Sequence, residues 1–151
     1  MSLAEIINDD IKKTMLARDS RKLEALRAIK AALLIAKTGK DAGSGEIPED
    51  IELQLLQRLV KQRKESAEIY ISQNRPDLAE DEQFQSAIIE AYLPEQMSPD
   101  ELRNIIKTII GQVGASSIKD MGKVMGLASK QLAGKADTKA ISLVIKDLLQ
   151  V

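Results

Sequence analysis

Apolar residues recur at spacings of three and four along most of the chain, and this period of about 3.6 residues predicts α-helices. The pattern predicts seven of them, over residues 3–17, 20–37, 48–72, 76–92, 99–114, 118–132 and 138–150. We therefore expect an all-α fold.

The second predicted helix has two different apolar sides. Its larger residues gather on one side, namely Leu23, Leu26, Ile29, Leu33 and Leu34. At about 100° per residue, four alanines fall on the other side, namely Ala25, Ala28, Ala32 and Ala36. Because both sides can pack against neighbours, we expect this helix to lie in the middle of a bundle.

The helical pattern is interrupted at two segments. Residues 38–47 are rich in glycine, cannot sustain a helix and predict a mobile loop. The sequence Ser98-Pro99-Asp100-Glu101 combines a capping serine, a proline at the first helical position and a glutamate at the third, which is a signature of a helix start. The segment before it is the expected boundary between two small helical subdomains. These are a bundle with a long third helix over residues 1–95 and a three-helix bundle over residues 96–151.

The composition removes most catalytic chemistry. The chain of 151 residues has no Cys and no His, which excludes disulfides, thiol nucleophiles, imidazole bases and nearly every zinc site. Aromatic residues make up 2%, so the core must be aliphatic, and the stacking platforms of proteins that bind single-stranded nucleic acid are scarce. We therefore expect no catalytic residue, no metal and no cofactor.

The same sequence gives an expectation about location. No apolar run approaches the roughly 20 residues needed to span a bilayer. The N-terminal residues MSLAEIINDD carry early acids and lack the basic start of a signal peptide. A cytoplasmic protein without a membrane partner is expected.

Several short sequences resemble functional motifs but lack the features that those motifs require. None of the three Gly-Lys pairs has the glycine five positions earlier that a phosphate-binding loop requires, and Gly43-Ser44-Gly45 lacks the context of a dinucleotide site. The adjacent residues Asp9 and Asp10 diverge by about 100° on a helix, which favours a solvated face over a shared proton or metal. The pair Ser116-Ser117 is interpreted as a helix cap rather than an amidase nucleophile.

The net charge of −1 hides a polarised chain. Residues 12–40 carry nine basic and two acidic residues, residues 77–95 carry six acidic residues and no base, and residues 98–151 carry eight bases and five acids. The acids near residue 77 lie at the start of a predicted helix, where the helix dipole favours negative charge.

The sixth predicted helix carries the most informative pattern. Its apolar stripe contains Met121, Val124, Met125, Ala128 and Leu132. Its other side carries Lys119, Lys123 and Lys130 within about 40° of one another, beside Gly122 and Gly126. A glycine inside a helix costs about 1 kcal/mol relative to alanine, so two of them one turn apart need a physical reason.

Two explanations of these glycines are open. The first is close packing against another helix of the same protein. The second is a surface without side chains, ringed by ammonium groups, that a phosphate backbone can approach. Further lysines extend this candidate RNA-binding set, namely Lys135, Lys139 and Lys146.

Longer motifs resemble the YqeY family. In the C-terminal part these are Lys119-Asp120-Met121-Gly122-Lys123-Val124-Met125, Gly134-Lys135-Ala136-Asp137 and Val144-Ile145-Lys146. Further upstream they are Ile7-Asn8-Asp9-Asp10-Ile11-Lys12, Leu23-Leu26-Arg27, Lys61-Gln62-Arg63-Lys64-Glu65-Ser66, Arg75-Pro76-Asp77-Leu78-Ala79 and Tyr92-Leu93-Pro94-Glu95-Gln96. The resemblance covers essentially the whole chain, with one departure, since Thr138 stands where the family usually has glycine.

This resemblance implies a function. YqeY proteins are similar to the C-terminal tail of GatB, a subunit of the glutamine-dependent amidotransferase that corrects misacylated Glu-tRNA and Asp-tRNA. The family's fold is two small helical subdomains, and the GatB tail holds the body of the tRNA without chemistry of its own. The implied enzyme class is a carbon–nitrogen ligase with glutamine as amide donor.

Three functions follow as hypotheses. The preferred one is a non-catalytic helical module that binds tRNA or another RNA, acting beside an aminoacyl-tRNA enzyme or amidotransferase subunits. The second is amide transfer, alone or as a subunit. The third is a protein–protein adaptor whose acidic helix at residues 77–92 docks a basic partner.

Overall fold

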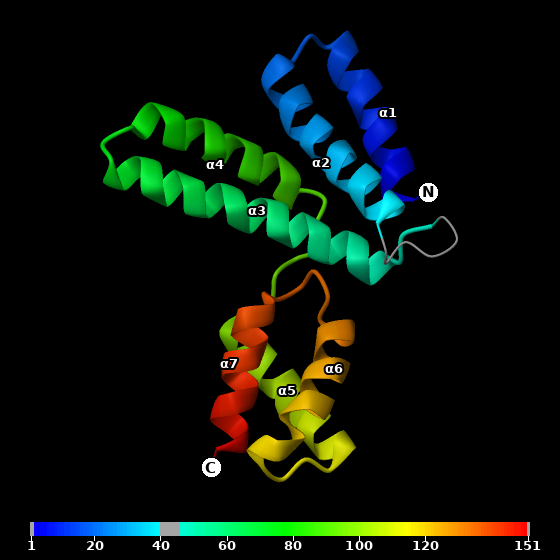
Figure 1. Cartoon of the computed structure of the whole chain (residues 1–151), viewed down its shortest axis with the longest axis vertical. Helices are drawn as coiled ribbons and strands as arrows, with labels where there is room; N and C mark the ends of the chain where they lie inside the picture. Colours follow the sequence, from blue (N-terminus) through cyan, green and yellow to red (C-terminus); the bar gives the residue numbers. More distant parts are fainter. Residues whose placement is uncertain (1, 40–45, 151) are drawn as a thin grey trace. The chain divides into compact units, whose positions relative to one another are not determined.

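The computed structural model describes residues 2–39 and 46–150. The chain forms two compact units, residues 1–93 (unit 1) and residues 94–151 (unit 2). Every regular element among the described residues is a helix, so the predicted all-α class is confirmed (Figure 1). The predicted division at residue 95, and the likeness of residues 96–151 to the GatB tail, stay predictions.

The helices lie close to their predicted positions. Unit 1 contains α1 (Leu3–Leu16), α2 (Ser20–Thr38), α3 (Glu49–Ser72) and α4 (Pro76–Glu90). Unit 2 contains α5 (Pro99–Val113), the 3₁₀ turn η1 (Ile118–Asp120), α6 (Met121–Gln131) and α7 (Thr138–Leu149).

The differences from the predicted bounds are local. Helix α3 begins one residue later than predicted, because Pro48 caps it instead of occupying its first turn. The predicted sixth helix starts as the 3₁₀ turn η1 and becomes α-helical only at Met121. Within the predicted loop at 38–47, α2 still includes Thr38, and residues 40–45 lie outside the described residues.

Helix α2 contacts each of the other three helices of unit 1. It packs against α1, α4 and part of α3, while α3 and α4 pack along each other. Its central position was predicted and is confirmed, although Leu34 on its leucine side is 55% exposed. The core of unit 1 consists of Ile7, Leu26, Ile29, Leu33, Leu56, Val60 and Ile89.

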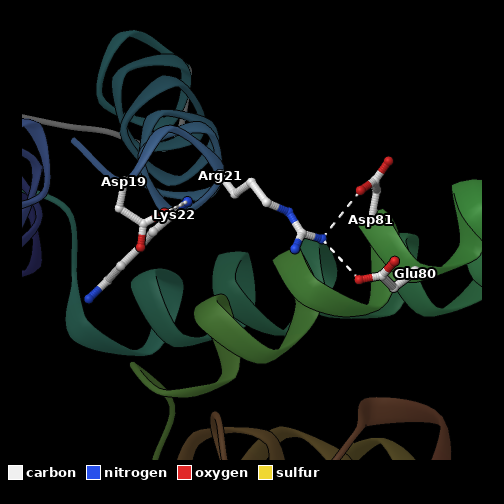
Figure 2. A network of polar contacts seen from close by, with 5 residues as sticks. All are labelled: Asp19, Arg21, Lys22, Glu80 and Asp81. Atoms are coloured by element: carbon white, nitrogen blue, oxygen red, sulfur yellow. Dashed lines mark hydrogen bonds and ion pairs between the residues drawn. The ribbon is translucent and has the colours of Figure 1, made fainter. Parts of the chain in front are cut away.

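Arg21 links α2 to the acidic start of α4, as Figure 2 shows. Its Nη2 atom lies 3.4 Å from Glu80 Oε1 and 3.3 Å from Asp81 Oδ1, and its guanidinium carbon lies 4.1 Å from the centre of the Phe84 ring. Exposed ion pairs contribute about 0.2–1 kcal/mol and an exposed cation–π contact about 0.5–1 kcal/mol. The acidic cluster therefore holds two helices together, a role that the sequence did not reveal.

Tyr92 connects the segment after α4 to α1. Its hydroxyl donates a hydrogen bond to Asp10 Oδ2 at 2.5 Å, and burial of the side chain, aided by this bond, raises the pKa of Tyr92 above its ordinary value. The neighbouring Asp9 pairs with Lys13 at 3.0 Å. The two carboxylates diverge as predicted, but the solvated face was wrong for Asp10, which is partly buried and hydrogen-bonded.

Unit 2 is a three-helix bundle in which α5, α6 and α7 pack against one another. The predicted helix start is confirmed, because Ser98 Oγ accepts the Glu101 N–H at 3.2 Å and Pro99 occupies the first turn. Gly114 ends α5 in the left-handed conformation with a φ of 69°. The core consists of Leu102, Ile106, Ile109, Val124, Ala128, Leu132, Ala136, Ile141, Ile145 and Leu149.

Replacing Ile29 by alanine should destabilise unit 1 by about 2–4 kcal/mol, because the side chain is fully buried between α2 and its neighbours. Urea unfolding followed by tyrosine fluorescence measures this unit alone, since both tyrosines, Tyr70 and Tyr92, belong to it and the chain has no Trp. The exposed Leu34→Ala is the control and should change stability by less than about 0.5 kcal/mol. Equal effects of the two variants would contradict this assignment of the core.

The Tyr92–Asp10 hydrogen bond should make unit 1 sensitive to alkaline pH. Because the pKa of Tyr92 is raised in the folded protein, the unfolded chain ionises first, so stability should fall as pH rises above about 10. Tyr92→Phe should cost about 1 kcal/mol at neutral pH and show a shallower alkaline decline. Urea unfolding by far-UV circular dichroism at several pH values measures both effects, and parallel declines in the two proteins would refute the coupling.

Candidate nucleic-acid interface

Helix α6 has one side in the core of unit 2 and one side facing solvent. Val124 and Ala128 are fully buried, while Met121 and Met125 pack partly buried against them, so the predicted apolar stripe is confirmed. Lys123 and Lys130 are exposed on the other side.

Lys119 differs from its predicted setting. It lies in η1, so the helical period that aligns Lys123 with Lys130 does not fix its direction. Its side chain is nevertheless exposed, one residue before the aspartate that caps the turn. The sequence placed Lys119 at the right end of the helix but assigned it the wrong helical geometry.

Gly122 and Gly126 expose bare backbone. A Cβ atom built on either glycine would meet nothing within 4 Å, beyond the helix's own backbone and the adjacent residues. Both residues are exposed. Of the two explanations left open by the sequence, close packing against another helix does not account for these glycines within the described residues.

Lys135 lies in the connection between α6 and α7, and its backbone is firmly held. Its N–H donates to Leu132 O at 2.9 Å, and its carbonyl accepts the Met97 N–H at 2.9 Å. Next to it, Gly134 has a φ of 78° and its carbonyl accepts a hydrogen bond from Gln96 Nε2 at 2.6 Å. The exposed Lys135 side chain therefore projects from an ordered turn.

Helix α7 contributes the last two lysines. Lys139 and Lys146 are seven residues apart, two turns along the same side of the helix, and both are exposed. Thr138, which stands where the family usually has glycine, is the first residue of α7. The structure thus distributes the eight predicted residues over η1, α6, the connection and α7, all within unit 2.

Two acidic residues of unit 2 form contacts that the structure defines. Asp120 Oδ2 accepts the backbone N–H groups of Ser116 at 3.0 Å and Ser117 at 3.4 Å, which lowers the pKa of Asp120 and confirms the predicted cap. Asp147 pairs with Arg103 at 2.8 Å. All six lysines are exposed.

Neither a metal-binding cluster nor a membrane-spanning helix occurs among the described residues. Among them no group of three or more Asp, Glu, Cys or His side chains could hold a metal ion. No described helix combines the length and the apolar character needed to cross a membrane.

Comparison with known proteins identifies relatives in yeasts. The chain is similar to altered inheritance of mitochondria protein 41, a mitochondrial protein of Saccharomyces cerevisiae, with 26% identity over 90% of this chain and 71% of that protein. The proteins of the same name from Meyerozyma guilliermondii and Eremothecium gossypii are 31% and 32% identical, over 80% and 58% of this chain and 64% and 46% of their own lengths.

A family model gives the broader assignment. The model described as Yqey-like protein matches residues 4–149, which is nearly the whole chain and spans both units. The chain therefore belongs to the YqeY family.

Proposed function

We propose that this protein is a helical RNA-binding module whose ligand is tRNA, held by the lysine–glycine face of unit 2. This face comprises Lys119, Gly122, Lys123, Gly126, Lys130, Lys135, Lys139 and Lys146. The observation that carries the proposal is the open backbone at Gly122 and Gly126 beside exposed lysines.

The chemistry of this face suits a phosphate backbone. Ammonium groups on flexible stems bind phosphates as point charges, and bare helix backbone lets a partner approach closely. Unit 2 has no aromatic residue, so base stacking is not part of the proposed contact. Recognition of this kind follows the position of phosphates in a folded RNA and not the identity of its bases.

The similarity of YqeY proteins to the GatB tail supports tRNA in particular, and it makes a tRNA-dependent amidotransferase or an aminoacyl-tRNA enzyme the proposed partner. The cytoplasmic location stays a prediction, whereas the names of the yeast relatives place those proteins in mitochondria.

The two other interpretations also stay predictions. Carbon–nitrogen ligase activity rests on the family resemblance alone. The adaptor hypothesis relied on the acids of α4, but Glu80 and Asp81 lie beside Arg21, and Asp77 pairs with Arg75 at 3.1 Å. Fewer acidic groups are therefore left on α4 for a basic partner.

The combined replacement of Lys123, Lys130 and Lys139 by alanine should weaken tRNA binding and reduce its salt dependence. Each lost phosphate contact lowers the slope of log K against log salt by about 0.7–0.9. Filter binding of tRNA over a series of salt concentrations measures both quantities. The control removes three exposed lysines of unit 1, namely Lys12, Lys30 and Lys37. A slope that drops equally in the two triple variants, or in neither, would contradict the proposed face.

Replacing Gly122 and Gly126 by alanine should separate stability from binding. Open space surrounds both positions, so alanine at Gly126, inside α6, should stabilise the helix by about 1 kcal/mol through helix propensity, and alanine at Gly122, in the first turn, should stabilise it by less. The added methyl groups should hold a phosphate backbone away and weaken tRNA binding by about tenfold, or ~1.4 kcal/mol.

A matched control exists on α5. A Cβ atom at Gly111 would also meet nothing within 4 Å, so Gly111→Ala should stabilise unit 2 without changing tRNA affinity. Thermal unfolding by far-UV circular dichroism and the same filter assay measure the two properties. If the double variant binds tRNA as tightly as the unchanged protein, close approach at these glycines is not used.

A further inference from the structure

Unit 1 has an open groove between the last turns of α2 and the first half of α3, with a volume of about 480 Å³. Figure 1 shows that α2 and α3 run in clearly different directions, and they touch over only a short part of their length. The groove belongs to unit 1 alone and is separate from the lysine–glycine face.

The wall of the groove that α2 contributes is apolar. Ala32 and Ala36 lie one turn apart on α2, so their methyl groups leave room for a neighbouring backbone to come close. Ile35, between them, is 73% exposed. This side chain would gain a favourable free energy of burial if a partner covered it.

The opposite wall carries two parallel rows along α3. Ile51, Leu55 and Leu59 form an apolar row at intervals of four residues, and Leu55 and Leu59 also pack against the core. Gln54, Arg58 and Gln62 form a polar row at the same interval. Residues four apart lie on one side of a helix, so each row follows the groove.

The charge on the lining of the groove is positive. Arg58 is the charged residue among the described residues that line it, and it is exposed. An apolar floor beside a row with a single cation is complementary to an amphipathic helix that carries aliphatic residues on one stripe and carboxylates along its flank. The acidic helix of this chain, α4, does not fit that description, because its apolar side is buried in unit 1.

We propose that the groove binds an amphipathic helix of a partner protein, with its aliphatic stripe against Ala32, Ala36 and Leu55 and an acidic residue against Arg58. The apolar row from Ile51 to Leu59 spans about two helical turns, which corresponds to aliphatic anchors at positions i, i+4 and i+7 of the partner.

A pair of fluorescently labelled peptides of about four helical turns tests the proposal on the full chain. Both carry leucine at i, i+4 and i+7. One has glutamates along the flank of this stripe and its twin has lysines there. Fluorescence anisotropy should show that the glutamate peptide binds about three- to tenfold more tightly than the lysine twin. Arg58→Glu should reverse this order, whereas Arg27→Glu, the same change at an exposed arginine of α2 outside the groove, should preserve it.

A steric test is independent of charge. Ala36→Gln adds side-chain volume inside the groove with a good helix former and should abolish saturable binding of the glutamate peptide. Ala31→Gln, at an exposed alanine of α2 that does not line the groove, should leave it intact.

Three results would overturn the proposal. The first is the absence of saturable binding of either peptide by the unchanged protein. The second is binding that neither Arg58→Glu nor Ala36→Gln alters. The third is a concentration-dependent dimer in size-exclusion chromatography that Ala36→Gln dissociates, because a second copy would then be the occupant.

Discussion

Burial of one apolar stripe per helix is the constraint on which the rest of this structure depends. Helices of this length are marginal in water by themselves and become stable when an apolar side packs against neighbours. The chain has three aromatic residues, so its cores consist mainly of leucine, isoleucine, valine and alanine. These residues form two separate cores. The sides of the helices that do not face a core remain available to other molecules.

The two units use their charges in different ways. In unit 1, Arg21 lies against Glu80 and Asp81, and Lys64 pairs with Glu90, so charged groups connect neighbouring helices. In unit 2, Arg103 and Asp147 form such a pair, whereas the lysines of the lysine–glycine face are exposed. The basic surplus of unit 2 therefore remains directed to solvent, which is where a polyanion would meet it.

The lysine–glycine face and the α2–α3 groove suit different ligands. The face offers cations and bare backbone, which match phosphates, while the groove offers aliphatic side chains and one arginine, which match an amphipathic helix. A protein that holds RNA beside an enzyme, as proposed for this chain, has use for both kinds of contact, because it engages RNA and partner protein together. The two surfaces have no residue in common, so each can be altered without the other.

The all-α class, the approximate helix bounds, the start of α5 at Ser98 and the apolar stripe of α6 could all be predicted from the sequence. These features depend on the period of apolar residues and on capping residues, both of which involve residues close together in the sequence. The side on which Lys123 and Lys130 project follows from the same period. Lys119 was assigned the wrong geometry because residues 118–120 form a single 3₁₀ turn, and a turn of three residues is too short to show a period of its own in the sequence.

What covers each side of a helix became known from the packing of the folded chain. The sequence could not tell whether Gly122 and Gly126 were packed or open, since that depends on where α5 and α7 lie. It also gave no sign that Asp10 meets Tyr92 or that Arg21 meets α4, because these partners are about 60 to 80 residues apart in the chain. The alanine side of α2 shows the limit most directly. The prediction that this side packs against a neighbour holds for Ala25, which is fully buried, whereas Ala32 and Ala36 line an open groove between α2 and α3.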